Sequence, residues 1–263
     1  MLDVKNFKVQ FEGQQGLDEV VRGISFSMGA GEILGLVGES GSGKTVTALS
    51  LMGVLCHHRP RITGQMYFQG RDLLALPKKE IQKIQGAEIA MVFQEPKSSL
   101  NPLMKVGVQV EEGLRVHTSL SRAARRCRAL EAMERVQLPD PGRVYRQYPH
   151  ELSGGMRQRV MLAAAIVLEP ALLLCDEATT ALDACTQEQI VTLLAKLNRE
   201  QGMGILFISH DLQLVSRLCH RVIVMQNGEI VEQGDVKTLF HSPKAAYTKE
   251  LLNAIPGRGR RRE

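Results

Sequence analysis

Residues 33–45 read ILGLVGESGSGKT, and this stretch decides the fold of the chain. Ile33–Val37 is apolar throughout, which is typical of a strand that is covered on both faces of its sheet. Gly38–Thr45 then matches the pattern G-x-x-x-x-G-K-[ST], and apolar residues resume with helical spacing over Thr45–Val54. Glycines in such a loop turn backbone N–H groups inward, so the loop and the following helix start make a nest for anions. The stretch therefore predicts a strand, a phosphate-binding loop and a helix in succession.

This loop is expected to bind ATP. Lys44 would reach the β- and γ-phosphates, and the hydroxyl of Thr45 would ligate Mg²⁺. The remaining contacts would come from backbone and short side chains of the loop. The predicted nucleotide-binding set is Gly38, Glu39, Ser40, Gly41, Ser42, Gly43, Lys44 and Thr45.

A second apolar strand, Leu172–Cys175, is followed by the carboxylates of Asp176 and Glu177. Such residues at the carboxyl edge of a parallel sheet lie beside a phosphate loop. We expect Asp176 to hold Mg²⁺ through water and Glu177 to act as general base on the attacking water. An acidic pair at a strand end is usually just solvated, and the upstream phosphate loop is what favours a functional role here.

Composition excludes several other classes of protein. The chain has 263 residues, 44% hydrophobic and 23% charged, as in ordinary globular proteins. Its apolar runs are too short for a membrane-spanning helix, and the N-terminus does not resemble a signal peptide. Five irregularly spaced cysteines favour a reducing compartment over a disulfide framework. Removing the four arginines and one glutamate of residues 258–263 lowers the net charge from +5 to +2, so DNA binding is not supported.

The order of patterns predicts an α/β fold with an inserted helical part. Residues 2–28 alternate polar and apolar, which indicates half-buried antiparallel strands. Continuous apolar strands then alternate with helices, which indicates a parallel sheet. The stretch from about 97 to 165 is mostly helical in pattern. It includes an arginine-studded helix at Ser121–Val136 whose charges are expected to face solvent.

A third motif, Leu152-Ser153-Gly154-Gly155, precedes a predicted helix over Met156–Val167. Ser153 and the two glycines have the composition of a second anion nest at a helix start. Ser-Gly-Gly alone would usually be a turn or linker. With the first loop present, it would instead serve a nucleotide held by a partner chain.

With these motifs the sequence resembles the ATP-binding-cassette (ABC) ATPases over essentially its whole length. The resemblance implies a P-loop NTPase with a RecA-like core (1–96 and 166–240), an N-terminal antiparallel β-subdomain, a helical subdomain (about 97–165) and a C-terminal extension (241–256). A basic tail at 257–263 is expected to be disordered. The resemblance also implies roles for single residues: a glutamine loop and Mg²⁺ contact for Gln94, a coupling loop at Ala181-Leu182-Asp183, and a switch histidine for His210. Phe11 is either the adenine-stacking aromatic or a plain core strand residue.

A narrower resemblance concerns the peptide/nickel importer branch. It is carried by Phe93–Pro96, Ser99–Pro102, Thr179–Asp183, Tyr247–Pro256 and the phrase Gly234–Phe240. Because the sequence ends at 263, and because of that last phrase, it is most similar to nickel or metallophore importer ATPases. Import of di- or oligopeptides is the alternative. His57-His58 is expected to be a loop and not a nickel site, and Ala178 replaces the proline usual in the family.

The resemblance implies a peripheral ATPase on the cytoplasmic face of the cell membrane. Its partners would be a second ATPase subunit, in a heterodimer rather than a homodimer, two transmembrane permeases and, indirectly, an extracytoplasmic substrate-binding protein. The surface around Gln94–Pro102 would transmit motion to the permeases.

Other nucleotide-binding classes fit less well. A DNA-repair or chromosome cassette would carry a long coiled coil between Lys44 and Asp176, which are only 132 positions apart without sustained heptads. A translation-type cassette protein would carry two motif sets, and a simple P-loop kinase or GTPase would lack Ser-Gly-Gly. An adaptor would have lost the catalytic residues.

Overall fold

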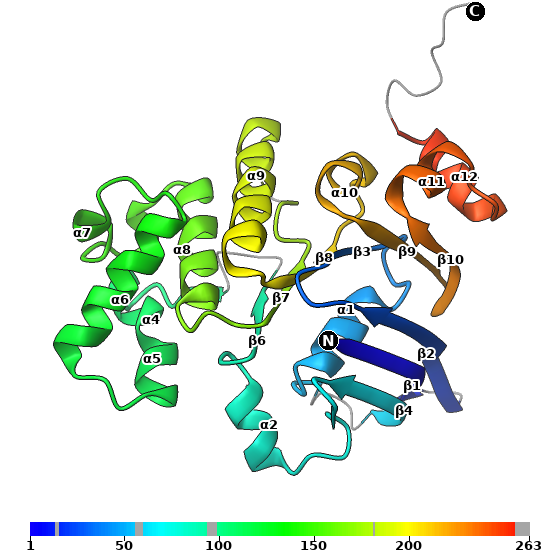
Figure 1. The fold of residues 1–263 in the computed structure, drawn as a ribbon, viewed down its shortest axis with the longest axis horizontal. Helices are drawn as coiled ribbons and strands as arrows, with labels where there is room; N and C mark the ends of the chain where they lie inside the picture. Colours follow the sequence, from blue (N-terminus) through cyan, green and yellow to red (C-terminus); the bar gives the residue numbers. More distant parts are fainter. Residues whose placement is uncertain (14–15, 56–59, 94–98, 181, 256–263) are drawn as a thin grey trace, which may run out of the picture. The chain divides into compact units, whose positions relative to one another are not determined.

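The computed structural model describes residues 1–13, 16–55, 60–93, 99–180 and 182–255 (Figure 1). The chain divides into two compact units, Met1–Ile81 with Gly204–Glu263, and Gln82–Met203. The helical insertion predicted at about 97–165 falls within the second unit. Gln94, His57-His58, Ala181 and the basic tail at 257–263 lie outside the described residues.

The first unit contains an antiparallel sheet of four strands in the order β2-β1-β4-β5. Its long strands β1 (Leu2–Gly13) and β2 (Gly16–Met28) pair as predicted from their alternating pattern, with Val9 opposite Val21. The strands β4 (Arg61–Phe68) and β5 (Arg71–Asp72) extend this sheet and were not predicted. The apolar residues of one face, such as Phe7 and Val9, are fully buried.

A second group of strands in the same unit runs in the order β10-β9-β3-β8. The central strand β3 (Ile33–Val37) pairs in parallel with β8 (Gly204–Ile208) and β9 (Arg221–Gln226), and every residue of β3 and β8 is buried. This confirms the predicted parallel strands. The strand β10 (Glu229–Asp235) is antiparallel to β9, which the sequence did not indicate.

The helices of the first unit follow these strands. The helix α1 (Lys44–Leu51) begins directly after the glycine-rich loop. The helix α10 (Leu212–Leu218) follows β8, and α11 (Val236–His241) and α12 (Ala246–Asn253) follow β10. The helix α2 (Lys78–Ile84) crosses the boundary between the two units.

The second unit combines a pair of parallel strands with helices. The strands are β6 (Ile89–Val92) and β7 (Leu172–Asp176), with Met91 opposite Leu174. The helix α8 (Gly154–Ile166) packs against β6 and against other helices. The helices described in this unit include, besides α8, α4 (Val106–Val110), α5 (Glu112–His117), α6 (Arg122–Arg135), α7 (Pro141–Val144) and α9 (Ala184–Gln201).

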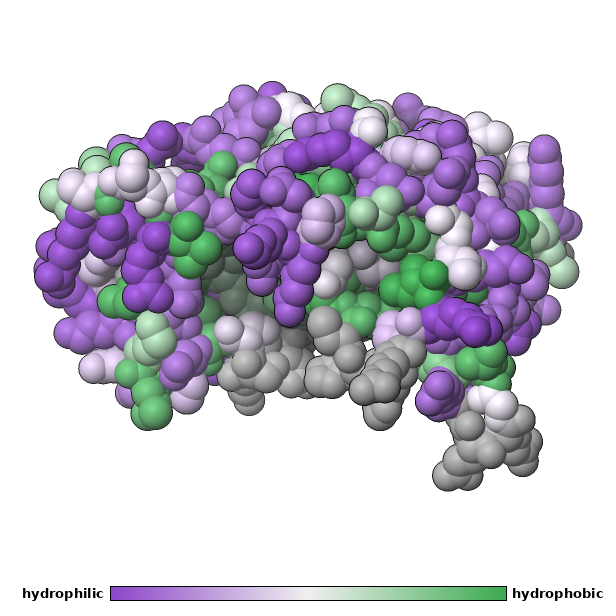
Figure 2. Space-filling model, turned by 90° about the horizontal axis from the view of Figure 1, so that it is seen from below, coloured by the Kyte–Doolittle hydropathy of each residue, from purple (hydrophilic) through white to green (hydrophobic). Residues whose placement is uncertain are grey.

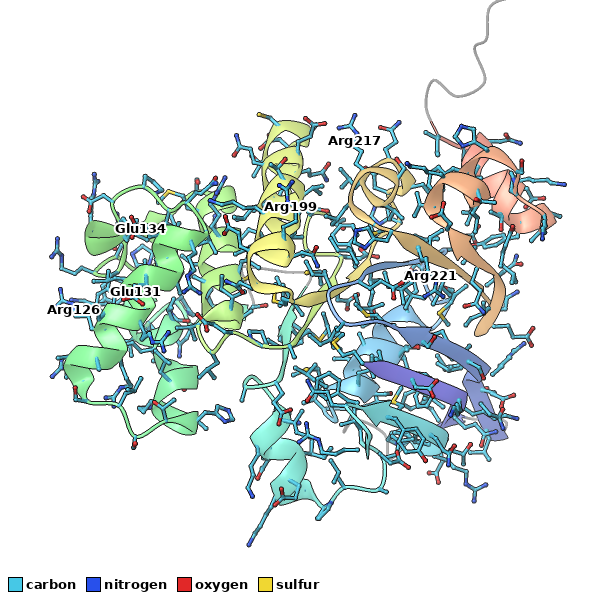
Figure 3. The ribbon with its side chains drawn as sticks, in the orientation of Figure 1. Arg126, Glu131, Glu134, Arg199, Arg217 and Arg221 are labelled. Atoms are coloured by element: carbon cyan, nitrogen blue, oxygen red, sulfur yellow. The ribbon has the colours of Figure 1, made fainter. Side chains whose placement is uncertain are left out.

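The arginine-rich helix α6 confirms the expectation of a solvated charged face. Ser121 caps its start, because the hydroxyl accepts a hydrogen bond from the N–H of Ala124 at 3.3 Å. Figure 3 labels Arg126, Glu131 and Glu134 on this helix, and all three are exposed. Its opposite face, which includes Met133, is buried in the core of the second unit.

Among the described residues, no helix combines the length and the hydropathy that crossing a bilayer would require. Figure 2 shows one face of the molecule, on which hydrophilic residues cover most of the surface with hydrophobic residues between them.

Candidate functional site

The glycine-rich loop between β3 and α1 has the backbone geometry of an anion nest. Gly38, Gly41 and Gly43 have φ angles of 149°, 82° and 97°. Residues that carry a Cβ atom rarely adopt such positive φ angles. Ser40, Gly41 and Thr45 are exposed, whereas Ser42 and Gly43 are buried. The loop therefore presents an open side to solvent at the N-terminus of α1, where N–H groups favour bound anions.

Close packing fixes this loop from behind. A Cβ atom on Gly38 would lie 2.1 Å from the carbonyl oxygen of Met225 in β9, and one on Gly43 would lie 2.9 Å from that of Val20 in β2. Both neighbours are backbone atoms, which cannot rotate away as a side chain would. These two glycines are therefore required by contact as well as by conformation.

Lys44 is held inside the loop by the loop's own oxygens. Its side chain is buried, and Nζ donates hydrogen bonds to the carbonyl oxygens of Gly38 at 2.8 Å and Glu39 at 2.7 Å. It also donates to the hydroxyl of Ser42 at 3.3 Å. The ammonium group is thus placed in the loop that is predicted to surround phosphates.

The acidic pair lies at the end of β7 as predicted. Asp176 is buried, 4% exposed, and is the last residue of the strand. Glu177 follows with a φ of 46°, in the left-handed region, and its carboxylate accepts a hydrogen bond from the Thr180 hydroxyl at 3.2 Å. A strained backbone of this kind is often found at functional sites.

Burial raises the pKa of the neighbouring Cys175 thiol to about 12, so this cysteine stays protonated and is no nucleophile.

The second predicted nest is the N-terminus of α8. Ser153 caps this helix, since its hydroxyl accepts a hydrogen bond from the N–H of Met156 at 3.3 Å. Gly154 and Gly155 form the first turn, and Ser153 and Gly154 are exposed. The start of a helix of 13 residues is therefore open to an anionic ligand.

The structure brings this helix start together with Thr186 and Asp183 of the same unit, and Asp183 belongs to the predicted coupling loop. Asp183 caps α9 and accepts hydrogen bonds from the N–H and the hydroxyl of Thr186, at 2.9 and 2.7 Å. These hydrogen bonds lower the pKa of Asp183. A Cβ atom on Gly155 would lie only 2.8 Å from Cγ2 of Thr186, whereas one on Gly154 would meet nothing nearer than 3.9 Å. Gly155 thus allows α8 to contact the cap of α9.

We expect the substitution Gly155→Ala to lower ATPase activity more than Gly154→Ala does. The added methyl group would displace Thr186 and weaken the cap that Asp183 makes. The double variant Gly155→Ala/Thr186→Ser should recover activity, because serine lacks Cγ2 but keeps the hydroxyl that bonds Asp183. Phosphate release by each variant tests this. Equal activity of the single and double variants would contradict the proposed contact.

The remaining predicted residues lie in the first unit or outside the described residues. His210 is exposed at the end of β8, and the next residue, Asp211, caps α10 by accepting hydrogen bonds from the N–H groups of Gln213 and Leu214. Phe11 is half-buried in β1, opposite Asp18. Gln94 is not described. Site roles for these residues stay predictions.

Two contacts at these loops were missed by sequence reasoning. Thr186 had no role in any recognised motif. Tyr247 belongs to the pattern that resembles the importer branch, which predicts no contact for it, yet its hydroxyl accepts a hydrogen bond from the N–H of Glu39 in the glycine-rich loop at 3.0 Å. No local signal indicates a contact across 208 positions of sequence.

Comparison with known proteins gives consistent matches. A family model described as ABC transporter matches residues 21–180. A probable peptide ABC transporter ATP-binding protein of Sinorhizobium fredii is 44% identical over 264 residues, covering 100% of this chain and 79% of the relative. The dipeptide transport ATP-binding protein DppD of Escherichia coli is 43% identical over 256 residues, covering 97% of this chain and 78% of the relative.

The fold of this chain is also similar to those of solved structures. The ATP-binding cassette MJ0796, in a dimeric post-hydrolysis state bound to ADP and Pi, matches with a TM-score of 0.80 and 30% identity, covering 90% of this chain and 99% of that one. The structure of cbiO1 from Clostridium perfringens, part of the ABC transporter complex cbiONQ, matches with a TM-score of 0.78 and 28% identity, covering 92% and 90%.

Proposed function

Because this chain belongs to the ABC transporter family, we propose that it is the ATP-hydrolysing subunit of an importer for short peptides. The observation that carries the proposal is the loop Gly38–Thr45. Three glycines with positive φ open its backbone to an anion, and Lys44 is buried within it. These features, between a fully buried strand and a helix start, suit the phosphates of ATP.

Hydrolysis needs a metal ion and an activated water. Oxygen donors are the ligands that Mg²⁺ prefers, and the exposed hydroxyl of Thr45 and the buried carboxylate of Asp176 are such donors. They would hold Mg²⁺, which neutralises phosphate charge when bound. Glu177 would accept the proton of the attacking water, with its carboxylate oriented by Thr180. Gln94 and His210 are proposed to assist at the γ-phosphate.

The open helix start at Ser153–Gly155 would complete a site on a second ATPase subunit. Two chains would then enclose two ATP molecules, each between one chain's glycine-rich loop and its partner's α8. A post-hydrolysis dimer of the related cassette MJ0796 supports such pairing. We propose a heterodimer rather than a homodimer, as the resemblance to this importer branch implies.

Permease subunits would dock on the second unit at the surface around Gln94–Pro102, of which residues 94–98 lie outside the described part of the chain. Large apolar side chains that flank this stretch are exposed: Phe93 is 43% exposed, Leu103 86% and Val108 44%. A permease that docks here would bury this exposed apolar area. The chain would thus lie peripherally on the cytoplasmic face of the membrane, with a substrate-binding protein on the opposite side as an indirect partner.

The relatives favour peptides over nickel as the cargo. The proteins from Sinorhizobium fredii and Escherichia coli carry peptide and dipeptide transport in their names, and each aligns with nearly the whole chain. The nickel prediction drew on one phrase, Gly234–Phe240, and on the length of the sequence, and it is not confirmed. Nickel import therefore becomes the second candidate.

Uptake assays separate the two cargoes. In the cells that make this protein, replacing it with the Glu177→Gln chain should abolish uptake of labelled di- and oligopeptides and leave uptake of nickel ions intact. Loss of nickel uptake with peptide uptake retained would favour the second candidate. A cell in which both are unchanged would count against a role in either import system.

A further inference from the structure

The C-terminal helix α12 reaches the glycine-rich loop through Tyr247. The ring of Tyr247 is buried, 7% exposed, and its hydroxyl accepts the hydrogen bond from the N–H of Glu39. Burial raises the pKa of this hydroxyl, so it remains neutral at physiological pH. The N–H of Glu39 is therefore bonded from outside the loop, by a residue that no ATP-binding motif contains.

This hydrogen bond acts on the peptide group that anchors Lys44. The N–H of Glu39 and the carbonyl of Gly38 belong to one planar peptide unit. Tyr247 binds its N–H end, and Nζ of Lys44 binds its carbonyl end at 2.8 Å. Because Gly38 has no Cβ atom, it offers little steric resistance of its own to rotation of this unit about its Cα–C bond. Both ends of this peptide unit are therefore hydrogen-bonded, one to Tyr247 and the other to Lys44.

The start of α12 is itself fixed to the sheet. The carboxylate of Glu232 in β10 accepts hydrogen bonds from the N–H groups of Lys244 and Ala245, at 2.9 and 3.0 Å. Ala245 is the residue that precedes the first turn of α12. A carboxylate at a helix N-terminus is favoured by the helix dipole. Glu232 thus fixes the N-terminus of α12, two residues before Tyr247.

The end of α12 and the two residues after it border the segment that contains His210. Leu251 lies on α12 one turn after Tyr247, and Ala254 and Ile255 directly follow the helix. Together with residues 210–213 they line a pocket of about 420 Å³ within the first unit. Residues 247–255 therefore contact the glycine-rich loop through Tyr247 and line this pocket through Leu251, Ala254 and Ile255.

We propose that α12 is a positioning element of the ATP site and that Tyr247 is its positioning residue, which orients the Gly38–Glu39 peptide and through it Lys44. The inference rests on the proposed ATP-binding function of the loop. Its consequence is that ground-state binding of ATP depends on α12, although Tyr247 lies outside the phosphate-binding loop.

The test is the substitution Tyr247→Phe, which removes the hydroxyl and retains the buried ring. Loss of this part-buried hydrogen bond should weaken ATP binding about three- to tenfold. The Kd for ATP, measured by equilibrium dialysis, and the KM of the ATPase should both rise by this factor. The kcat at saturating ATP should change less than twofold, because the carboxylates at the end of β7 are untouched.

Two further variants distinguish an effect of Tyr247 from a general effect of losing a hydroxyl. Tyr67→Phe in β4 removes a hydroxyl from the antiparallel sheet and leaves the ring that lies 5.6 Å from Nζ of Lys5, so Kd and KM should not change. Glu232→Ala loosens the start of α12 and should raise KM in the same direction as Tyr247→Phe.

An unchanged Kd and KM in Tyr247→Phe, with wild-type chain binding ATP normally, would overturn this inference alone. A lowered Tm and kcat without a rise in KM would also overturn it, since that result indicates a merely structural role. Failure of the wild-type chain to bind ATP would instead refute the proposed function.

Discussion

The Glu177→Gln chain is expected to bind ATP as tightly as the wild type and to hydrolyse it about 10²- to 10⁴-fold more slowly, which is the range that general-base catalysis contributes. Glutamine has nearly the same shape as glutamate, and its amide oxygen can still accept the hydrogen bond from Thr180. The left-handed backbone at this position costs both residues a similar amount. The substitution therefore removes the general base and should leave the local fold intact.

Three measurements test the Glu177→Gln chain. ATP binding by equilibrium dialysis should be retained, and phosphate release should be lost. Size-exclusion chromatography with Mg²⁺ and ATP should show a dimer that persists, because the nucleotide that joins two chains is not consumed. The partner ATPase subunit is included if the isolated chain does not self-associate.

A matched control is Glu200→Gln on α9. Glu200 is exposed and forms an ion pair with Lys196 at 3.8 Å, a contact worth about 0.3–0.5 kcal/mol on a helix surface. Its removal should leave turnover unchanged. Hydrolysis at the wild-type rate by Glu177→Gln would refute the assignment of Glu177 as the base, whatever the control shows.

The parts of the fold that sequence predicted are those encoded by local patterns. The strand β3 and the loop after it are recognisable because an apolar run, three glycines and Lys44 occur in succession. Likewise the alternation in residues 2–28 follows the period of a strand with one buried face. In each case the residues that determine the structure are neighbours in the chain.

The parts that it missed depend on tertiary contacts. The strand β4, with its sequence RITGQMYF, is mostly exposed over its first half and is formed by pairing with β1. The strand β10, EIVEQGD, is polar and is formed by pairing with β9. Pairing with a neighbour overrides weak intrinsic preference for strand structure.

The same reasoning applies to the candidate site. The motifs identified Lys44, Asp176 and Glu177 because their chemistry is tied to recognisable spacing. The contacts of Thr186 with Gly155 and of Tyr247 with Glu39 have no such spacing, and only the folded chain brings them together.

The second large effect is expected for Gly38→Ala, which should abolish measurable ATP binding. The new Cβ atom would lie 2.1 Å from the carbonyl oxygen of Met225, well inside van der Waals contact. Because β3 and β9 are paired, with Val37 opposite Val224, this oxygen cannot move away without breaking the pairing of the two strands. The φ of 149° at Gly38 adds strain for any L side chain.

The two penalties determine the size of this effect. Overpacking typically costs about 1–3 kcal/mol, and a sparsely populated backbone conformation costs about 1–3 kcal/mol more. The loop can avoid both only by leaving β9, which would also displace the carbonyl that holds Lys44. We therefore expect a lower Tm together with a loss of ATP binding that is not restored by raising Mg²⁺ concentration.

Gly70→Ala separates the clash at Gly38 from the general cost of a positive φ. Gly70 has a φ of 80° in the turn after β4, but no atom lies within 4 Å of where its Cβ would be. Alanine there should lower stability by about 1–2 kcal/mol, the cost of a left-handed residue, and leave the Kd for ATP unchanged. If Gly38→Ala behaved like Gly70→Ala and bound ATP normally, the contact with β9 would not set the shape of the loop. The phosphate-binding role of the loop would then need a different structural basis.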